Sequence, residues 1–209
     1  MKFRPAKDNQ DSRPEDEPKE IMSDKKTFRR EVALMVANEL VSALAPFCEI
    51  IEIAGSLRRE KSQVGDIEIL FVPRLESRQK DFFSKEPINL ADEEIGRLLA
   101  NGTFAKRPSK IGVFTWGKNN KLATHIPSGI PVDLFCESDL QEWPRSLAIR
   151  TGPKEFNIQL MSTAPKNGYS AHAYGESLHK MPTGERVISK NEREFIELCG
   201  VVYKEPRDR

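Results

Sequence analysis

Two carboxylates stand two residues apart on a predicted strand, shortly after a Gly-Ser turn. Asp66 and Glu68 lie at the start of an apolar run that continues to Val72. Because side chains alternate along a strand, the two acids share one face with Cα atoms about 6.5 Å apart, while Ile67 and Ile69 enter the core. Neighbouring carboxylates repel each other, and a divalent cation such as Mg²⁺ relieves that repulsion. The pair predicts a metal site, and the alternative is a solvated edge strand.

The turn before this strand has the composition of an anion-binding site. Gly55 and Ser56 follow an apolar run at 50–54 that predicts another strand, and they stand where a short helix would begin. The unpaired N–H groups at the start of a helix favour an anion such as a phosphate. Arg58 and Arg59 add positive charge. The order strand, turn, short helix, strand thus predicts a phosphate cradle beside the metal site.

A further acid is the only charged residue of another short apolar run. Asp133 lies within residues 130–135, after the turn at 127–129. Burying an unpaired charge is costly unless a cation or another partner compensates it. We therefore expect Asp133 to have such a partner. The alternative is an ordinary aspartate that faces solvent from a strand.

These motifs resemble the active-site signature of the DNA polymerase beta family (family X), within the nucleotidyltransferase superfamily. The matching positions are Gly55-Ser56-x-Arg58-Arg59 and then Gly65-Asp66-x-Glu68, without gaps. The resemblance runs from about residue 26 to the end of the chain, and its later matches are Thr151-Gly152, Phe156-Asn157, Gly168-Tyr169 and 203–209. It implies an α+β fold: a nucleotidyltransferase-fold palm with a mixed β-sheet flanked by helices, plus a small, mainly helical C-terminal subdomain.

The resemblance also implies a chemistry, two-metal nucleotidyl transfer, in which a hydroxyl group attacks the α-phosphate of a nucleoside triphosphate and pyrophosphate leaves. Asp66 and Glu68 would bind two Mg²⁺ ions, with Mn²⁺ as a substitute, and Asp133 would hold the ion that activates the hydroxyl. The residues expected to bind the nucleotide are Gly55, Ser56, Arg59, Gly65, Thr151, Gly152 and Asn157. The alternative for Arg58 is support of the fold, and for Asn157 a place on the surface.

Several positions depart from the family pattern. Glu68 replaces the usual aspartate, which moves the carboxylate oxygens and bears on metal preference. Val64 replaces a phosphate-contacting serine, while Pro131 and Met161 replace basic residues. Ile149-Arg150 stands where an aromatic pair senses the sugar. Weak discrimination between deoxyribose and ribose is therefore predicted.

The function that the resemblance favours is template-directed DNA polymerisation, by short gap filling or primer extension. The expected partners are a nucleoside triphosphate and a DNA primer-template or gapped DNA. The alternatives are a nucleotidyltransferase with a non-DNA acceptor, such as tRNA, a protein or a small molecule, and a nucleotide-binding module without catalysis. Because only a short polar tail precedes the first predicted helix, no lyase or helix-hairpin-helix segment is expected. A weak grip on DNA follows unless a partner protein supplies one.

Composition sets outer bounds. The chain has 209 residues, with 33 basic residues against 32 acidic ones, and this near-zero balance does not by itself indicate nucleic-acid binding. One basic cluster predicts either phosphate contacts or a solvated face: Lys106, Arg107, Lys110, Lys118 and Lys121. The three cysteines are far apart and indicate neither a disulfide framework nor a zinc site. Without a long apolar run or a signal peptide, we expect a soluble, cytoplasmic protein, monomeric and independent of membranes.

The pattern along the chain predicts three regions. Residues 1–23 form a flexible polar tail, residues 24–137 the catalytic palm, and residues 138–209 a C-terminal subdomain that faces nucleotide and template. Within the palm we expect helices at 24–46 and 92–101 and a hairpin of strands 111–116 and 122–126, whereas 74–88 shows no clean period.

Three helices are expected in the C-terminal subdomain. Ser138 or Asp139 caps the first, which breaks at Pro144. Pro153 begins the second, which ends before Gly168. The third begins with a capping box formed by Ser189 and Glu192.

Overall fold

The computed structural model describes residues 26–173, 175 and 178–209. The predicted polar tail and the predicted helix caps Ser23 and Asp24 lie outside these described residues.

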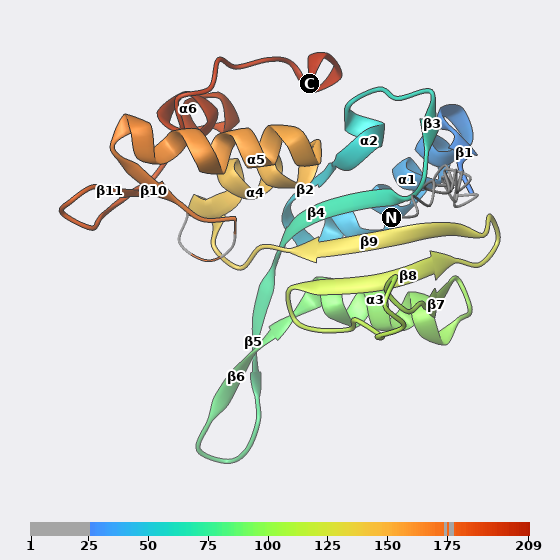
Figure 1. Cartoon of the computed structure of the whole chain (residues 1–209). Helices are drawn as coiled ribbons and strands as arrows, with labels where there is room; N and C mark the ends of the chain where they lie inside the picture. The colour runs from blue at the N-terminus through green and yellow to red at the C-terminus, as the bar shows by residue number, and fades with distance from the viewer. Residues whose placement is uncertain (1–25, 174, 176–177) are drawn as a thin grey trace, which may run out of the picture.

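A five-stranded mixed sheet forms the centre of the molecule (Figure 1). Its strands, in spatial order, are β2 (Cys48–Ile53), β4 (Ile67–Pro73), β9 (Ile130–Cys136), β8 (Asn120–His125) and β7 (Phe104–Lys106). The pair β4 and β9 is parallel, and the other pairs are antiparallel. The predicted mixed sheet, including the run of β8 into β9 through the turn at 127–129, is confirmed.

Two helices cover one face of this sheet. Helix α1 (Arg30–Leu44) and helix α3 (Leu90–Ala100) pack their apolar stripes on β4, whose residues Ile67, Ile69 and Phe71 are at most 1% exposed. The 3-10 turn η1 (Ala45–Phe47) joins α1 to β2. The alternate residues of β4 therefore face the other side of the sheet, where Leu70 packs against Phe135 and Leu147.

Short elements surround the Gly-Ser turn. Helix α2 (Gly55–Arg58) follows β2 directly, and β3 (Gln63–Val64) pairs with β1 (Phe28–Arg29) before the chain enters β4. The predicted order of strand, turn, short helix and strand is confirmed.

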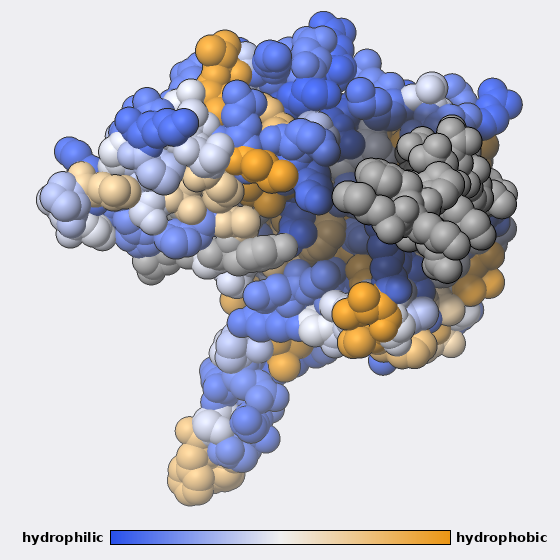
Figure 2. Space-filling view, viewed as in Figure 1, coloured by the Kyte–Doolittle hydropathy of each residue, from blue (hydrophilic) through white to orange (hydrophobic). Residues whose placement is uncertain are grey.

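A two-stranded arm projects from the body between β4 and α3 (Figure 1). Strands β5 (Leu75–Gln79) and β6 (Lys85–Asn89) pair with each other alone, and Asp81 orders the turn by accepting the backbone N–H groups of Phe83 and Ser84 at 2.9 Å each. All five residues of β5 are exposed, so the strand carries no apolar alternation. This explains why residues 74–88 show no clean period. Figure 2 shows the apolar tip of the arm.

The predicted strand at 111–116 is wrong. Residues 107–119 form a loop with two isolated bridges, Pro108 to Phe114 and Trp116 to Lys121, and β8 pairs with β7 instead. The apolar run is exposed in this loop, with Ile111 at 85%. Gly112 with φ +81° interrupts the extended backbone, and β7 pairs with residues 123–125 of β8. The predicted segment therefore meets this edge only through Thr115 and Trp116.

The C-terminal part builds a core of its own from three helices and a small sheet. The helices are α4 (Trp143–Thr151), α5 (Lys154–Thr163) and α6 (Glu192–Leu198), and the 3-10 turns are η2 (Leu140–Glu142), η3 (Ala164–Asn167) and η4 (Pro206–Asp208). The antiparallel sheet of β10 (Tyr169–Ala171), β11 (Leu178–Lys180) and β12 (Glu185–Val187) was not predicted. Its strands of three residues are too short for a clear period.

Two helix boundaries here differ from expectation. Asp139 caps η2 as expected, but Pro144 lies in the first turn of α4 rather than ending a helix, because that turn needs no N–H from the proline. The capping box is also wrong: Asn191 caps α6 by accepting the N–H of Glu194 at 2.9 Å. In the described part of the chain, no helix is both long enough and apolar enough to span a membrane.

Candidate active site

The sheet brings the three predicted acids to one face. Glu68 on β4 lies directly beside Asp133 on β9 in the parallel register, and Asp66 immediately precedes β4. Since Ile67 and Ile69 point into the helix-covered core, Asp66 and Glu68 project from the opposite face. The carboxylates therefore gather from two neighbouring strands, as the sequence predicted for the first two.

Two of these acids have a raised pKa. Burial, followed by the negative charges of Asp66 and Asp133, raises the pKa of Glu68 to about 8. Burial also raises the pKa of Asp133, although Arg107 opposes the shift. Three hard oxygen donors that repel one another are a donor set suited to a divalent cation.

The pKa of Glu68 predicts a pH-dependent stability. A carboxylate whose pKa is raised on folding destabilises the fold as pH rises from its unfolded value of 4.5 towards 8. In metal-free buffer, we expect Glu68→Gln to stabilise the chain by about 2 kcal/mol at pH 8.5 and to have little effect at pH 4.5, after allowance for partial exposure. Urea unfolding of both proteins at the two pH values measures this. An equal difference at both pH values would contradict it.

Asp133 has a partner that the sequence did not predict. Arg107 Nη2 donates a hydrogen bond to Asp133 Oδ1, and Arg107 Nε donates to the carbonyl of Ala123 at 3.0 Å. In this arrangement, no three His, Cys, Asp or Glu side chains among the described residues form a ready-made metal site. The donor chemistry fits Mg²⁺ or Mn²⁺, while ligation of the ions stays a prediction.

Gly55 makes room for Glu68. It adopts φ +61°, which only glycine takes without strain, and the Glu68 carboxylate occupies the space where a Cβ at position 55 would stand. The backbone N–H of Ala54 also donates to the carbonyl of Glu68 at 2.8 Å. The glycine of the motif thus serves the close packing of α2 against the acid-bearing strand.

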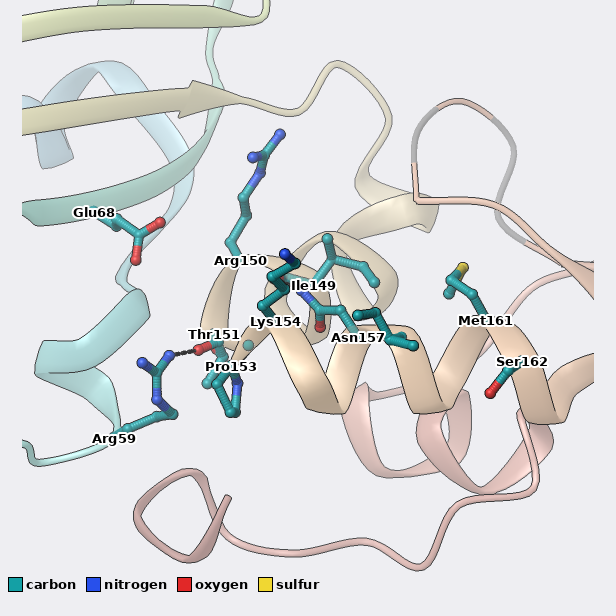
Figure 3. A pocket seen from close by; sticks show the side chains of 12 residues that line it. Arg59, Glu68, Ile149, Arg150, Thr151, Pro153, Lys154, Asn157, Met161 and Ser162 are labelled. Carbon is teal, nitrogen blue, oxygen red and sulfur yellow. Dashed lines mark hydrogen bonds between the residues drawn. The ribbon is translucent and has the colours of Figure 1, made fainter. Parts of the chain in front are cut away.

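Two side chains of the predicted phosphate cradle have unmet hydrogen-bonding capacity. Ser56 Oγ and Arg59 Nε are buried without a hydrogen-bond partner. Arg59 Nη1 donates to the carbonyl of Thr151 (Figure 3). Buried polar groups are nearly always satisfied, so a ligand that accepts hydrogen bonds would complete both residues.

A pocket of about 770 Å³ lies between this cradle and the C-terminal helices. Figure 3 shows Arg59 and Glu68 on one side and the residues of α4 and α5 on the other. The predicted residues Thr151, Gly152 and Asn157 line it. Asn157 Nδ2 donates to the carbonyl of Ile149 at 2.8 Å, whereas its Oδ1 is buried without a partner.

Some predicted residues lie beside this pocket rather than on it. Gly55 and Ser56 belong to α2, and Gly65 is half-buried in the link from β3 to β4, next to Asp66. None of these three is among the residues that line the pocket, whereas Arg59 and Glu68 are.

Arg58 binds the C-terminal part. It forms a two-pronged ion pair with Glu192, at 2.9 and 2.8 Å, and donates to Thr151 Oγ1 at 2.6 Å. Arg209 donates to the same Glu192 at 2.8 Å and has a fully buried side chain. Arg58 therefore holds α2 against α4 and α6, in line with the alternative of fold support. The sequence carries no local signal for this cluster.

The basic cluster is not a free patch. Lys121 is 5% exposed and donates to Asp92 at 2.7 Å, Arg107 binds Asp133, and Lys106 stands over the Trp116 ring at 5.0 Å. The interpretation of all five residues as phosphate contacts is thus wrong for Lys121, which the fold buries.

Together these elements define an α+β protein with a mixed sheet flanked by helices and a small, mainly helical C-terminal part. Residues 146–209 match the family model described as DNA polymerase beta thumb. The chain is also 25% identical over 179 residues to the DNA polymerase/3'-5' exonuclease PolX of Bacillus subtilis (strain 168), an alignment that covers 85% of this chain and 27% of that protein. The chain is thus similar to DNA polymerase beta in its C-terminal part and to a PolX polymerase over most of its length. It spans about a quarter of the length of the Bacillus relative.

Proposed function

We propose that the chain catalyses nucleotidyl transfer and extends a DNA primer, in short gaps or on a primer-template. One observation carries the proposal: three acids share the sheet face that adjoins a pocket with unsatisfied polar groups on both sides. The relationship to DNA polymerases of family X supports it.

The roles of the residues follow from their positions. Ser56 and Arg59 would donate hydrogen bonds to the triphosphate, where negative charge accumulates as pyrophosphate leaves. Asn157 would meet the base with its free amide oxygen. Asp66, Glu68 and Asp133 would hold Mg²⁺ or Mn²⁺ ions, which when bound activate the attacking hydroxyl and neutralise phosphate charge.

Primer extension tests this function directly. The purified chain is given gapped, nicked and single-stranded DNA, with each nucleotide and with Mg²⁺ or Mn²⁺. Extension directed by the template supports the proposal. No extension of any DNA substrate would overturn it. Nucleotide transfer to tRNA or to a protein, each supplied in place of DNA, would favour a non-DNA acceptor.

The residues at the sugar end of the pocket predict weak selection against ribonucleotides. Ile149 and Arg150 line the pocket, and the Arg150 guanidinium stacks 3.7 Å above the centre of the Phe135 ring. An aliphatic side chain and an arginine that lies on the Phe135 ring provide no aromatic wall against a 2′-hydroxyl. We expect kcat/KM for dNTP and NTP to differ by no more than about tenfold, measured by single-nucleotide incorporation. Rejection of ribonucleotides by a thousandfold would contradict this.

A further inference from the structure

The ion pair between Arg107 and Asp133 spans an intervening strand. Arg107 directly follows β7, and its backbone N–H donates to the carbonyl of Leu122 on β8 at 3.0 Å. Leu122 lies opposite Asp133 on β9, so the arginine side chain crosses β8 to reach the acid. The two side chains are only 22% and 17% exposed.

Arg107 supplies the positive charge that balances Asp133, because β9 itself carries no basic residue. Asp133 is the only charged residue between Ile130 and Cys136, and it lies beside Glu68, another acid. The second anchor of Arg107, from Nε to the carbonyl of Ala123, fixes the guanidinium at the acid. Arg107 therefore stands where a cation is needed, and it is held there by the sheet backbone.

We propose that Arg107 is a latch that competes with divalent cations for Asp133. The proposal rests on the metal site of the proposed function. A guanidinium and a divalent ion on the same carboxylate repel each other. A divalent ion must therefore displace Arg107 from Asp133, or Asp133 binds the ion more weakly. The latch explains why the three acids share a face without forming a ready-made metal site among the described residues.

The test is Mn²⁺ binding by the whole chain without nucleotide or DNA, measured by calorimetry or by the electron paramagnetic resonance signal of free Mn²⁺. We expect Arg107→Ala to bind Mn²⁺ about tenfold more tightly than the wild type. Lys106→Ala removes the same charge one residue away, from a side chain over Trp116, and should change the affinity less than twofold. Asp133→Asn should weaken binding and abolish the gain from Arg107→Ala.

The possible outcomes distinguish the latch from a general electrostatic effect, and they test it separately from the metal site and the polymerase activity. Unchanged affinity in Arg107→Ala, with weaker binding in Asp133→Asn, would overturn the latch and leave the metal site. Equal tightening in Arg107→Ala and Lys106→Ala would overturn it in favour of general electrostatics, and Mn²⁺ binding by neither wild type nor variant would overturn latch and metal site together. Tightening without primer extension would support the latch and sink only the polymerase proposal.

Arg107→Lys guards against a folding defect. It keeps the charge but loses the forked geometry that bonds Ala123 and Asp133 together, so we expect a gain of about threefold in Mn²⁺ affinity. Thermal unfolding checks that each variant is folded. If only Arg107→Lys folds, an affinity equal to that of the wild type would overturn the latch.

Discussion

Asp133→Asn is expected to lower the rate of nucleotide incorporation by about a thousandfold, the order of effect seen when a charge-stabilising group is lost from a transition state. Asparagine keeps the shape of the side chain but removes the negative charge that lies beside Glu68. Single-turnover primer extension with Mg²⁺ measures the effect without interference from product release.

Asp139→Asn is the matched control for this loss. Asp139 follows the same strand within a few residues, but its carboxylate binds Arg186 at 2.7 Å and caps η2. We expect its incorporation rate to stay within twofold of the wild type, given equal folding. Equal incorporation by wild type and Asp133→Asn would show that the acid is not catalytic and that the activity arises elsewhere.

The second large effect concerns stability. Glu192→Gln should lower the free energy of unfolding by about 3 kcal/mol, because it leaves two guanidinium groups without a counter-charge. Glu192 is 9% exposed, and its partners Arg58 and Arg209 are 21% and 0% exposed. Urea unfolding at pH 7, followed by circular dichroism, measures the loss.

An exposed acid on the same helix provides the control. Glu197 pairs with Arg193 at 3.8 Å, with both side chains more than half exposed, so Glu197→Gln should change stability by less than about 0.5 kcal/mol.

Burial alone would raise the pKa of Glu192, but Arg58 and Arg209 outweigh it and lower the pKa below 4.5. Its contribution is therefore present above pH 4.5 and lost as pH falls further. Equal losses from both substitutions at pH 7 would contradict the buried cluster.

The local sequence predicted the elements that carry the first two acids. Alternation along β4 places Ile67 and Ile69 in the core and Asp66 and Glu68 opposite them, and the Gly-Ser turn predicts α2. Period and turn composition are properties of neighbouring residues, so they can be recognised without the fold. The same holds for the strand of Asp133.

Local sequence patterns did not predict strands correctly where a strand is held by backbone pairing and has no buried face. The arm of β5 and β6 is stabilised by its ladder and by Asp81 in its turn, and it has no buried face to reveal a period. Conversely, the apolar residues of 111–116 suggested a strand, but β7 pairs with residues 123–125 of β8 and only the end of the predicted segment bonds the rest of that edge. Which strand occupies an edge is decided by the whole sheet.

The sequence by itself determined which acids, which glycine and which residues of the predicted phosphate cradle lie near the Gly-Ser turn, because they are close in the chain and follow the strand period. Only the tertiary structure decided their partners. Arg107 bonds Asp133 across β8, and Arg58 on α2 bonds Glu192 on α6, which lies far along the chain. Charges separated by so many residues are paired by strand order and helix packing, which no local pattern encodes.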